Sequence, residues 1–318
     1  MAEFNLPEPR PGDDREKLAD WLEIEALLST DGIGKLRELA RTLGIGGREE
    51  ADETSLAEQV FPEPDELIDG LTPVVQTLAQ RAESCTVAYP FTIDPQGTHV
   101  RARENWASST YAWMLLSCHF PASGSFSRGK SAIYHARLFE ALCVEAAKRY
   151  LGGDAQGARS FHFASPRPDG SGFDTALKRL RAAMHAEPRN LTAHAEKDAD
   201  LDVMAWRPWD DRVSNYLSLF GQCAGGNNWD QKFPNPRKFT DNWIELHGPD
   251  PIAALFLPRM LHAHEFRTNR SQGVIFNRCR IASLVPKLDE LGVAAASNPF
   301  KRWMTQAIVS SGAIAPRH

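Results

Sequence analysis

Residues 197–206 read KDADLDVMAW and residues 216–226 read YLSLFGQCAGG, and a polar turn from Arg207 to Asn215 separates them. Each segment contains a short run of strand-forming residues, and two such runs around a turn predict a β-hairpin. In an antiparallel pair, Asp202 near the start of the first strand would lie beside Gln222 near the end of the second. A carboxylate and an amide carbonyl are oxygen ligands of the kind that Mg²⁺ takes, so the hairpin predicts a metal site.

The acidic residues before the first strand have a simpler interpretation, because carboxylates in turns are commonly just solvated. What favours a site is the second strand, which places the amide of Gln222 where Val or Ile would pack better. A break in local consistency of this kind is expected at functional sites. Asp202 and Gln222 are therefore candidate site residues.

Composition and length indicate an ordinary globular protein. The 318 residues suffice for two domains, and 42% of them are apolar and 24% charged. No apolar run of about 18 residues occurs, so no membrane-spanning segment is expected. The N-terminal MAEFNLPEPRPGDDREK is acidic and rich in proline, without the apolar core of an export signal. Five widely spaced cysteines without a C-x-x-C pair favour a reducing, cytoplasmic location over a zinc site or a disulfide framework.

Charge is distributed unevenly along the chain. Residues 1–84 carry 8 basic and 20 acidic side chains, a net of −12, and residues 85–318 carry 28 basic and 21 acidic, a net of +7. We expect an acidic helical N-terminal domain at residues 1–125 and a second domain at residues 126–318. A basic body behind an acidic front suggests that the body binds a polyanion, the front, or both; the alternative is charge scattered over two domains.

Helical spacing of apolar residues runs through the first domain. The expected helices are Leu18–Leu28, Gly34–Leu43, Leu56–Val60, Leu67–Cys85 and Trp106–His119, of which the last is apolar enough to be buried. Thr86–Phe91 and His99–Val100 are short and strand-like. The sequence assigns no chemistry to this domain.

A long amphipathic helix opens the second domain. It is expected to run from Ser131, a fair N-cap residue, to Tyr150, just before the stop signal of Gly152. Glu140 stands at the edge of its apolar face and could point into a site beside a sheet; taken singly, a surface carboxylate is the commoner interpretation. The other expected elements are strands at Arg159–Phe163, Ile252–Leu257 and Gly273–Phe276, and helices at Asp174–His185, Phe239–Leu246, Ile281–Leu291 and Asn298–Ile308.

Several common chemistries lack the residues they need. The glycines after Gln222 are not followed by the Lys-Ser/Thr of a phosphate-binding loop, and no G-x-S-x-G nucleophile elbow occurs. Cys223 is a candidate nucleophile without a histidine placed to activate it. His262 and His264 could chelate a metal, but no third ligand stands at a known spacing. Metal-assisted hydrolysis of a phosphodiester remains.

Basic residues are concentrated toward the C-terminus. Eight of them, against three acidic residues, lie between Arg259 and Arg302. Several fall around a loop and a strand end, where phosphate contacts are usually made. We expect nucleic-acid binding by Arg259, Arg267, Arg270, Arg278 and Arg280. For any one of them, a solvated basic surface is the alternative.

At this point the chain resembles the PD-(D/E)xK restriction-endonuclease-like superfamily, nearest to its Mrr-like branch. The resemblance covers roughly residues 130–285 and rests on Phe139-Glu140 in the first helix, Asp200–Val203 at the first hairpin strand and Gly221–Ala224 on the second. It implies an α/β fold with an α-β-β-β-α-β core. It also implies that Asp202 ligates Mg²⁺, or Mn²⁺, that Gln222 replaces the second acid, and that Glu140 is the helix acid.

The chain departs from the family pattern at its lysine. The position two residues after the second acid holds Ala224 here, and the nearest lysines that could replace it are Lys197 and Lys232. The resemblance implies a Mg²⁺-dependent endonuclease acting on DNA in bacterial defence against phage or foreign DNA. The acidic front could dock another subunit of such a system, and the sequence leaves open whether the chain forms a homo-oligomer.

Two alternatives belong to other functional classes. One is a catalytically inactive nuclease-like fold that binds nucleic acid or a partner protein, which the missing lysine favours. The other is an interaction scaffold with no role on nucleic acid, which predicts no salt-dependent DNA binding.

Overall fold

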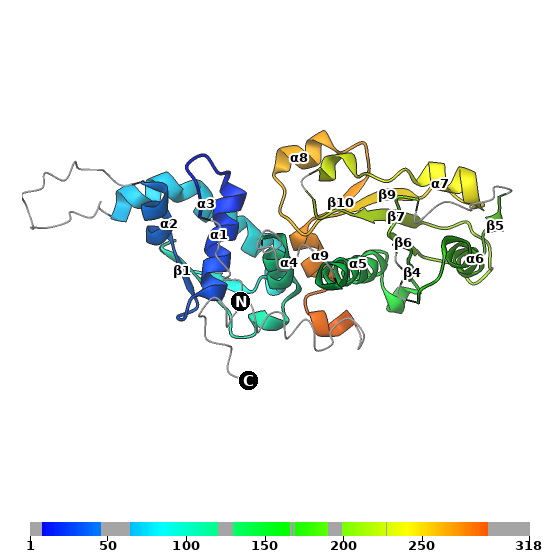
Figure 1. Cartoon of the computed structure of the whole chain (residues 1–318), viewed down its shortest axis with the longest axis horizontal. Coiled ribbons are helices and arrows are strands. Elements are labelled where there is room, and N and C mark those ends of the chain that lie inside the picture. The colour runs from blue at the N-terminus through cyan, green and yellow to red at the C-terminus, as the bar shows by residue number, and fades with distance from the viewer. Residues whose placement is uncertain are drawn as a thin grey trace, which may run out of the picture. The chain divides into compact units, whose positions relative to one another are not determined.

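The computed structural model describes residues 8–45, 64–119, 130–165, 167, 169–189, 199–226 and 228–291 (Figure 1). The chain divides into two units, of which the first contains the described residues up to 119 and the second those from 130 to 291. The domain boundary expected at residues 125 and 126 lies outside the described residues. So do the expected helices Leu56–Val60 and Asn298–Ile308, and Lys197.

The first unit is mixed rather than purely helical, which corrects the expectation of a helical domain. Its helices are α1 (Arg15–Leu28), α2 (Leu36–Leu43), α3 (Pro64–Cys85) and α4 (Thr110–His119). A three-stranded antiparallel sheet joins them, with β1 (Ile33–Lys35), β3 (His99–Ala102) and β2 (Phe91–Ile93) in that order. The expected helix at Gly34 begins two residues later, because Gly34 belongs to β1. Its backbone passes so close to the Leu22 carbonyl that a Cβ would clash.

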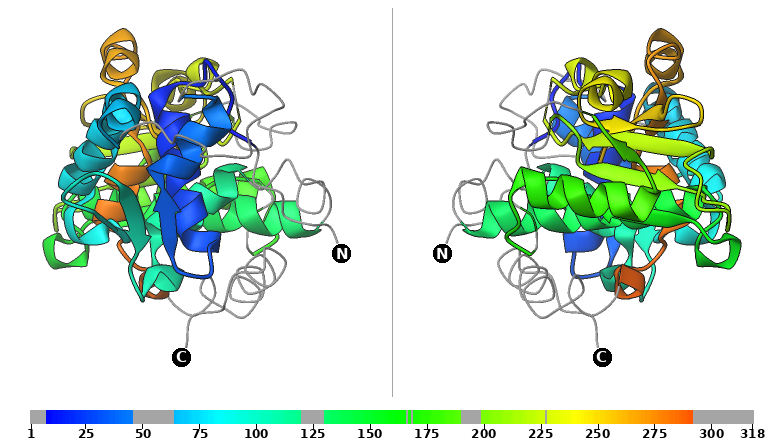
Figure 2. Two further views of the ribbon diagram at one scale, coloured as in Figure 1. Left: turned by 90° about the vertical axis from the view of Figure 1, so that its left-hand side faces the viewer. Right: turned by 90° about the vertical axis from the view of Figure 1, so that its right-hand side faces the viewer.

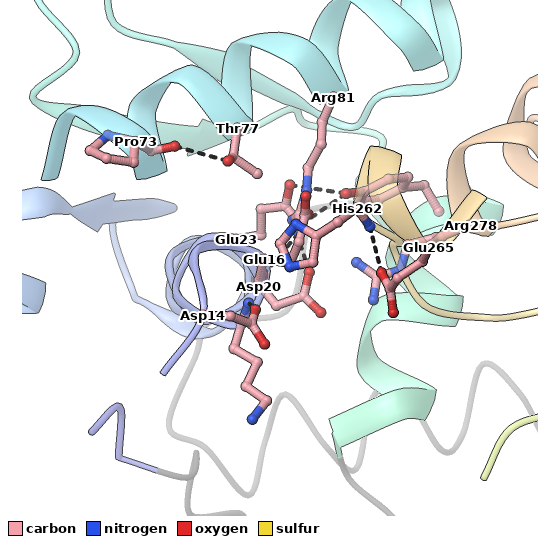
Figure 3. Close-up of polar contacts among 12 residues, drawn as sticks. Asp14, Glu16, Asp20, Glu23, Pro73, Thr77, Arg81, His262, Glu265 and Arg278 are labelled. Carbon is pink, nitrogen blue, oxygen red and sulfur yellow. Dashed lines mark hydrogen bonds and ion pairs between the residues drawn. The ribbon is translucent and has the colours of Figure 1, made fainter. Parts of the chain in front are cut away.

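A buried ionic cluster stabilises the first unit (Figure 3). The guanidinium of Arg81 on α3 is 2.6 to 2.9 Å from three carboxylates on one face of α1, those of Glu16, Asp20 and Glu23. The Glu23 carboxylate also accepts hydrogen bonds from the hydroxyls of Tyr89 and Tyr111. Burial and the charge of Glu23 raise the pKa of Tyr89 well above its usual range. The helix expected at Leu18–Leu28 contains Asp20 and Glu23, but α1 begins earlier and adds Glu16. The sequence did not indicate Arg81 as their common partner.

The second unit is built on a five-stranded mixed sheet in the order β10-β9-β7-β6-β4. The strands are β4 (Arg159–His162), β6 (Val203–Trp206), β7 (Ser218–Cys223), β9 (Ile252–Phe256) and β10 (Val274–Phe276). β4, β6 and β7 form an antiparallel meander, and β7, β9 and β10 are parallel. The predicted pairing of the two hairpin strands is confirmed. A separate short pair joins β5 (Glu187–Pro188) and β8 (Ile244–Glu245).

Helices cover both faces of this sheet. α5 (Lys130–Tyr150) packs along β4, β6 and β7 on one face (Figure 2). α6 (Phe173–Met184) and α7 (Pro236–Trp243) form the core on the other face with Met204, Trp206 and Phe220. β6 is buried on both faces, which explains why it reads as a continuous apolar run.

The remaining helices differ in length from the expectation. α7 begins three residues early, because the side chain of Asn235 accepts a hydrogen bond from the Lys238 N–H and Pro236 occupies the first turn. The expected helix Ile281–Leu291 is divided by Pro286 into α9 (Arg278–Leu284) and a short 3-10 turn at Leu288–Leu291. α8 is Ala263–Thr268. Within the part of the chain that the structure describes, no helix is long and apolar enough to cross a membrane.

Strand directions define one functional edge of the sheet. Because β7, β9 and β10 are parallel, their carboxyl ends lie at the same edge, and there the antiparallel meander also places the end of β4 and the start of β6. Ligands of open α/β sheets bind beyond the carboxyl ends of parallel strands. The candidate residues of the hairpin lie at this edge.

Candidate active site

Asp202 is held in place at the start of β6 by four hydrogen bonds. Its N–H donates to the Gly221 carbonyl at 2.9 Å, and its carbonyl accepts from the N–H groups of Phe163 and Ala164 at 2.8 and 3.2 Å. Its carboxylate Oδ2 accepts from the N–H of Cys223 at 2.7 Å. Asp202 therefore links the ends of β4 and β7, and its half-buried side chain is fixed by the backbone on either side of Gln222.

Gln222 is the residue that follows Gly221 in β7. The register of β6 and β7 ends at the pair Val203 and Gly221, and beyond it Asp202 bonds to the Gly221 carbonyl and the Cys223 N–H on either side of Gln222. Gly221 has a steric reason to be glycine, since a Cβ there would be 2.5 Å from a ring carbon of Phe256. The predicted meeting of the Asp202 and Gln222 side chains at one metal ion stays a prediction.

A pocket of about 290 Å³ opens beside Gln222 on the α7 side of the sheet. Its polar lining is Asp200, Gln222, Gln231, Lys232, Asn235 and Lys238, and its apolar lining is Ala199, Phe233, Pro234, Phe239 and Trp243. Lys232, proposed from the sequence as the replacement lysine, therefore shares a pocket with Gln222. Sequence reasoning missed Lys238, although Asn235-Pro236 is a helix-start signal that would have placed it in the first turn of α7.

Two residues of the pocket have left-handed backbone conformations. Ala199 has φ of 54° and Asp200 has φ of 58°. For a residue with a Cβ such a conformation costs about 1–2 kcal/mol, less for Asp, whose side chain tolerates it. Strained backbone of this kind is concentrated at functional sites, where the surrounding structure maintains it. The strain lies in the segment that leads into Asp202.

Ala224 stands where the family pattern has its lysine, and the packing around it explains why the position is apolar. Ala224 is buried in a cluster that includes Trp229, Leu255 and Ile275. An ammonium group at this position would lose its hydration among apolar side chains. Any positive charge near Gln222 must therefore come from another segment, and Lys232 and Lys238 on the following loop and helix are exposed lysines that line the pocket.

Glu140 lies on the opposite side of the sheet from the pocket. It projects from α5, and its Oε2 is 2.8 Å from Nε2 of His162 at the end of β4, with each side chain 16% exposed. Glu140 and Asp202 both influence the two thiols of Cys143 and Cys223, which places the two carboxylates in one neighbourhood. His162 was missed in the sequence, where the only signal was a polar residue inside a strand-like run.

The two cysteines of this neighbourhood are not built as nucleophiles. Burial is the main cause that raises the pKa of both the Cys143 and the Cys223 thiols, and the two thiols share a hydrogen bond. The nearby carboxylates of Glu140 and Asp202 raise both pKa values further. A thiol must ionise to act as a nucleophile, so Cys143 and Cys223 stay protonated and inert near neutral pH.

A scan against protein-family models found no match, and neither did a search of curated proteins or of solved structures.

The donor set can be compared with the needs of Mg²⁺. Among the residues that the structure describes, no group of three or more His, Cys, Asp or Glu side chains is arranged to hold a metal ion. Mg²⁺ needs less than that, because it keeps several waters and is commonly held by one or two carboxylates. Asp202 and Gln222 both carry oxygen donors at this end of the sheet. The Asp202 carboxylate lies in the neighbourhood of Glu140 and Cys143 on the α5 side, whereas Gln222 lines the pocket on the α7 side.

The five arginines expected to bind nucleic acid divide into two groups. Three of them bind the protein's own backbone: Arg259 donates to the carbonyls of Gly225 and Gly226, Arg278 to Pro258 and Arg280 to Ile275. Arg278 is fully buried and cannot reach a phosphate, which corrects that expectation. Arg267 and Arg270, at the end of α8, are exposed. Arg259 instead fixes the loop that follows Gln222.

Proposed function

We propose that this protein hydrolyses phosphodiester bonds of DNA with the help of Mg²⁺. The observation that carries the proposal is the meeting of Gln222 and Lys232 in one pocket, at the end of the sheet where Asp202 precedes β6. Metal-assisted phosphodiester hydrolysis uses oxygen ligands for the ion, and a nearby ammonium group would stabilise negative charge on the phosphate.

The order of elements in the second unit supports the proposal. α5, β4, β6, β7, α7 and β9 follow one another as helix, three antiparallel strands, helix and a strand parallel to the third. The α-β-β-β-α-β core implied by the resemblance to restriction-endonuclease-like proteins has the same order. α6 is then an insertion between its first and second strands. A fold alone does not define an activity, so the proposed activity depends on the residues of the site.

The roles of the residues follow from their positions. As the resemblance implies, Asp202 and Gln222 would hold the ion at this end of the sheet, helped by Glu140. When bound, the ion would lower the pKa of a coordinated water and neutralise charge on the scissile phosphate. Lys232 would stabilise negative charge at the same phosphate, and exposed Arg267 and Arg270 would attract the DNA backbone without reading its sequence.

A second candidate has a specific observation in its favour. Ala224 is packed in an apolar cluster, so β7 itself carries no lysine, and an amide stands where a second carboxylate would bind the metal more strongly. A nuclease-like subunit that binds DNA without cutting it would share every other feature. In either case we place the protein in bacterial defence against phage or foreign DNA, with the acidic first unit as the surface for another subunit.

Plasmid cleavage in Mg²⁺ separates these candidates. We expect Asp202→Asn to abolish cleavage and Lys232→Ala to reduce it by a factor of about 10² or more. Lys178→Ala is the matched control, since Lys178 is an exposed lysine on α6 that does not line the pocket. Equal cleavage by the wild type and Asp202→Asn would eliminate the catalytic assignment. If calorimetry shows that Asp202→Asn binds Mg²⁺ as tightly as the wild type does, Asp202 is not a ligand of the ion.

A further inference from the structure

The pocket beside Gln222 contains more chemistry than phosphodiester hydrolysis requires. Besides Lys232 it is lined by a half-buried aromatic ring, Phe233, by two amides, Gln231 and Asn235, and by a second lysine, Lys238. Attacking a phosphate needs none of these four side chains. Together they suggest a second ligand group next to the scissile phosphate.

An aromatic ring, amide groups and lysines in one pocket match the parts of a nucleotide. Every base has a π-face that stacks on aromatic side chains, and an unpaired base also offers its Watson–Crick edge to amides. The sugar-phosphate on either side attracts ammonium groups. A base inside a duplex offers neither its face nor that edge, because both are occupied by its neighbours.

The size and walls of the pocket favour one nucleotide over a duplex. Its volume is about 290 Å³, and its deep wall is formed by Phe239 and Trp243, both buried in the core against α6. Those rings are fixed by their own packing, with centroids 5.1 Å apart. A preformed cavity of this kind admits a base that has left the helical stack.

We propose that this pocket binds an unpaired nucleotide, with the base against Phe233 and the flanking phosphates beside Lys232 and Lys238. The substrate is then single-stranded DNA, or a duplex position at which a base is extruded. This inference rests on the proposed function for its choice of DNA as the ligand, but not for catalysis, since the binding needs no metal.

Binding without metal tests the proposal independently of cleavage. The full chain in EDTA is titrated into fluorescently labelled oligodeoxynucleotides, and anisotropy gives the affinity. We expect a single strand to bind at least about tenfold more tightly than the matching duplex, and a duplex with one unpaired base to regain part of that affinity. A strand with the same phosphates but abasic sites should lose about tenfold, because stacking is lost.

Variants assign the effect to the pocket. Phe233→Leu should weaken single-strand binding about tenfold while leaving attraction to an abasic strand unchanged. Phe266→Leu is the matched control, because Phe266 is partly buried against the same apolar cluster but does not line the pocket. Lys238 is exposed and tolerates truncation. Lys238→Ala should weaken binding and lower the slope of log affinity against log salt concentration by about one released counterion.

The contrary results are equally distinct. A duplex that binds as tightly as the single strand, or an abasic strand that binds as tightly as the intact one, would overturn the proposal. Equal weakening by Phe233→Leu and Phe266→Leu would do the same. A chain that binds bases in this way but cuts no DNA in Mg²⁺ would instead overturn the nuclease and leave the nucleotide site standing.

Discussion

The carboxylate of Asp202 accepts a 2.7 Å hydrogen bond from the backbone N–H of Cys223. This bond joins the start of β6 to the end of β7, so Asp202 has a structural role besides any catalytic one. We expect Asp202→Ala to lower the free energy of unfolding by about 1–3 kcal/mol, because the half-buried N–H loses its acceptor. Asp202→Asn keeps an acceptor oxygen and should cost less than Asp202→Ala.

Urea unfolding followed by circular dichroism measures both losses, and cleavage assays follow on the same samples. A stability loss in Asp202→Asn as large as that in Asp202→Ala would show that the hydrogen bond is not what the carboxylate contributes. If Asp202→Asn is folded and inactive, the negative charge itself is needed for cleavage.

The left-handed backbone at Ala199 predicts a substitution that stabilises the protein. Glycine adopts φ of 54° without a Cβ clash, so Ala199→Gly should raise the free energy of unfolding by about 1 kcal/mol. The control is Ala205→Gly in the buried, extended strand β6, which should lower it. A thermal shift of equal sign in the two variants would show that the backbone at Ala199 carries no strain.

The paired thiols predict a loss of stability in alkali. Burial raises the pKa of Cys143 and Cys223 above the ordinary value of 9.0, so above that pH the unfolded thiols ionise and the folded ones stay protonated. The unfolded state then binds fewer protons, and stability falls by about 1.4 kcal/mol per pH unit for each thiol. Below pH 8 the two thiols are protonated in both states, so their ionisation should give stability no pH dependence there.

A chain with Cys143→Ala and Cys223→Ala provides the measurement. Its free energy of unfolding, followed from pH 7 to pH 11, should decline less steeply than that of the wild type. Buried tyrosines such as Tyr89 contribute to the alkaline loss in both proteins, so only the difference in slope is diagnostic. If the free energy of unfolding falls equally steeply with pH in the two proteins, ionisation of the two thiols is not a cause of the alkaline loss.

In the first unit, the guanidinium of Arg81 forms ion pairs with three carboxylates of α1 at a buried position. Arg81→Met should destabilise the protein by about 3–5 kcal/mol, because charges would remain buried without their partner. Adding Glu23→Gln should recover part of that loss, since Glu23 is fully buried. Chemical denaturation of the single and double variants tests both effects. A loss under 1 kcal/mol in Arg81→Met would show that the carboxylates find other compensation.

Local structure was the part that the sequence predicted well. The helix expected at Ser131–Tyr150 is α5 at Lys130–Tyr150, and the one expected at Asp174–His185 is α6 at Phe173–Met184. The latter ends early because His185 adopts a left-handed conformation, with φ of 50°. The position and the ends of a helix are determined by apolar periodicity and turn residues in the same stretch of sequence, so they can be predicted from it.

The parts that the sequence did not predict depend on contacts between distant segments. Nothing in the residues around β1 indicates that it pairs with β3 across more than 60 positions, so the sequence of the first unit indicates helices without this sheet. His162 reaches Glu140 because α5 packs over β4, and Ala224 excludes a lysine because of neighbours on other strands. The pairing of β6 with β7 was predictable because a single hairpin sets it.

Gly221 and Phe256 together limit how this site could be redesigned or diversify. The ring of Phe256 occupies the space that any side chain at position 221 would need. The two positions therefore behave as one steric unit, in which a larger residue at 221 becomes tolerable only with a smaller one at 256. Libraries that vary the loop after Gln222 should hold this pair fixed or exchange both members at once.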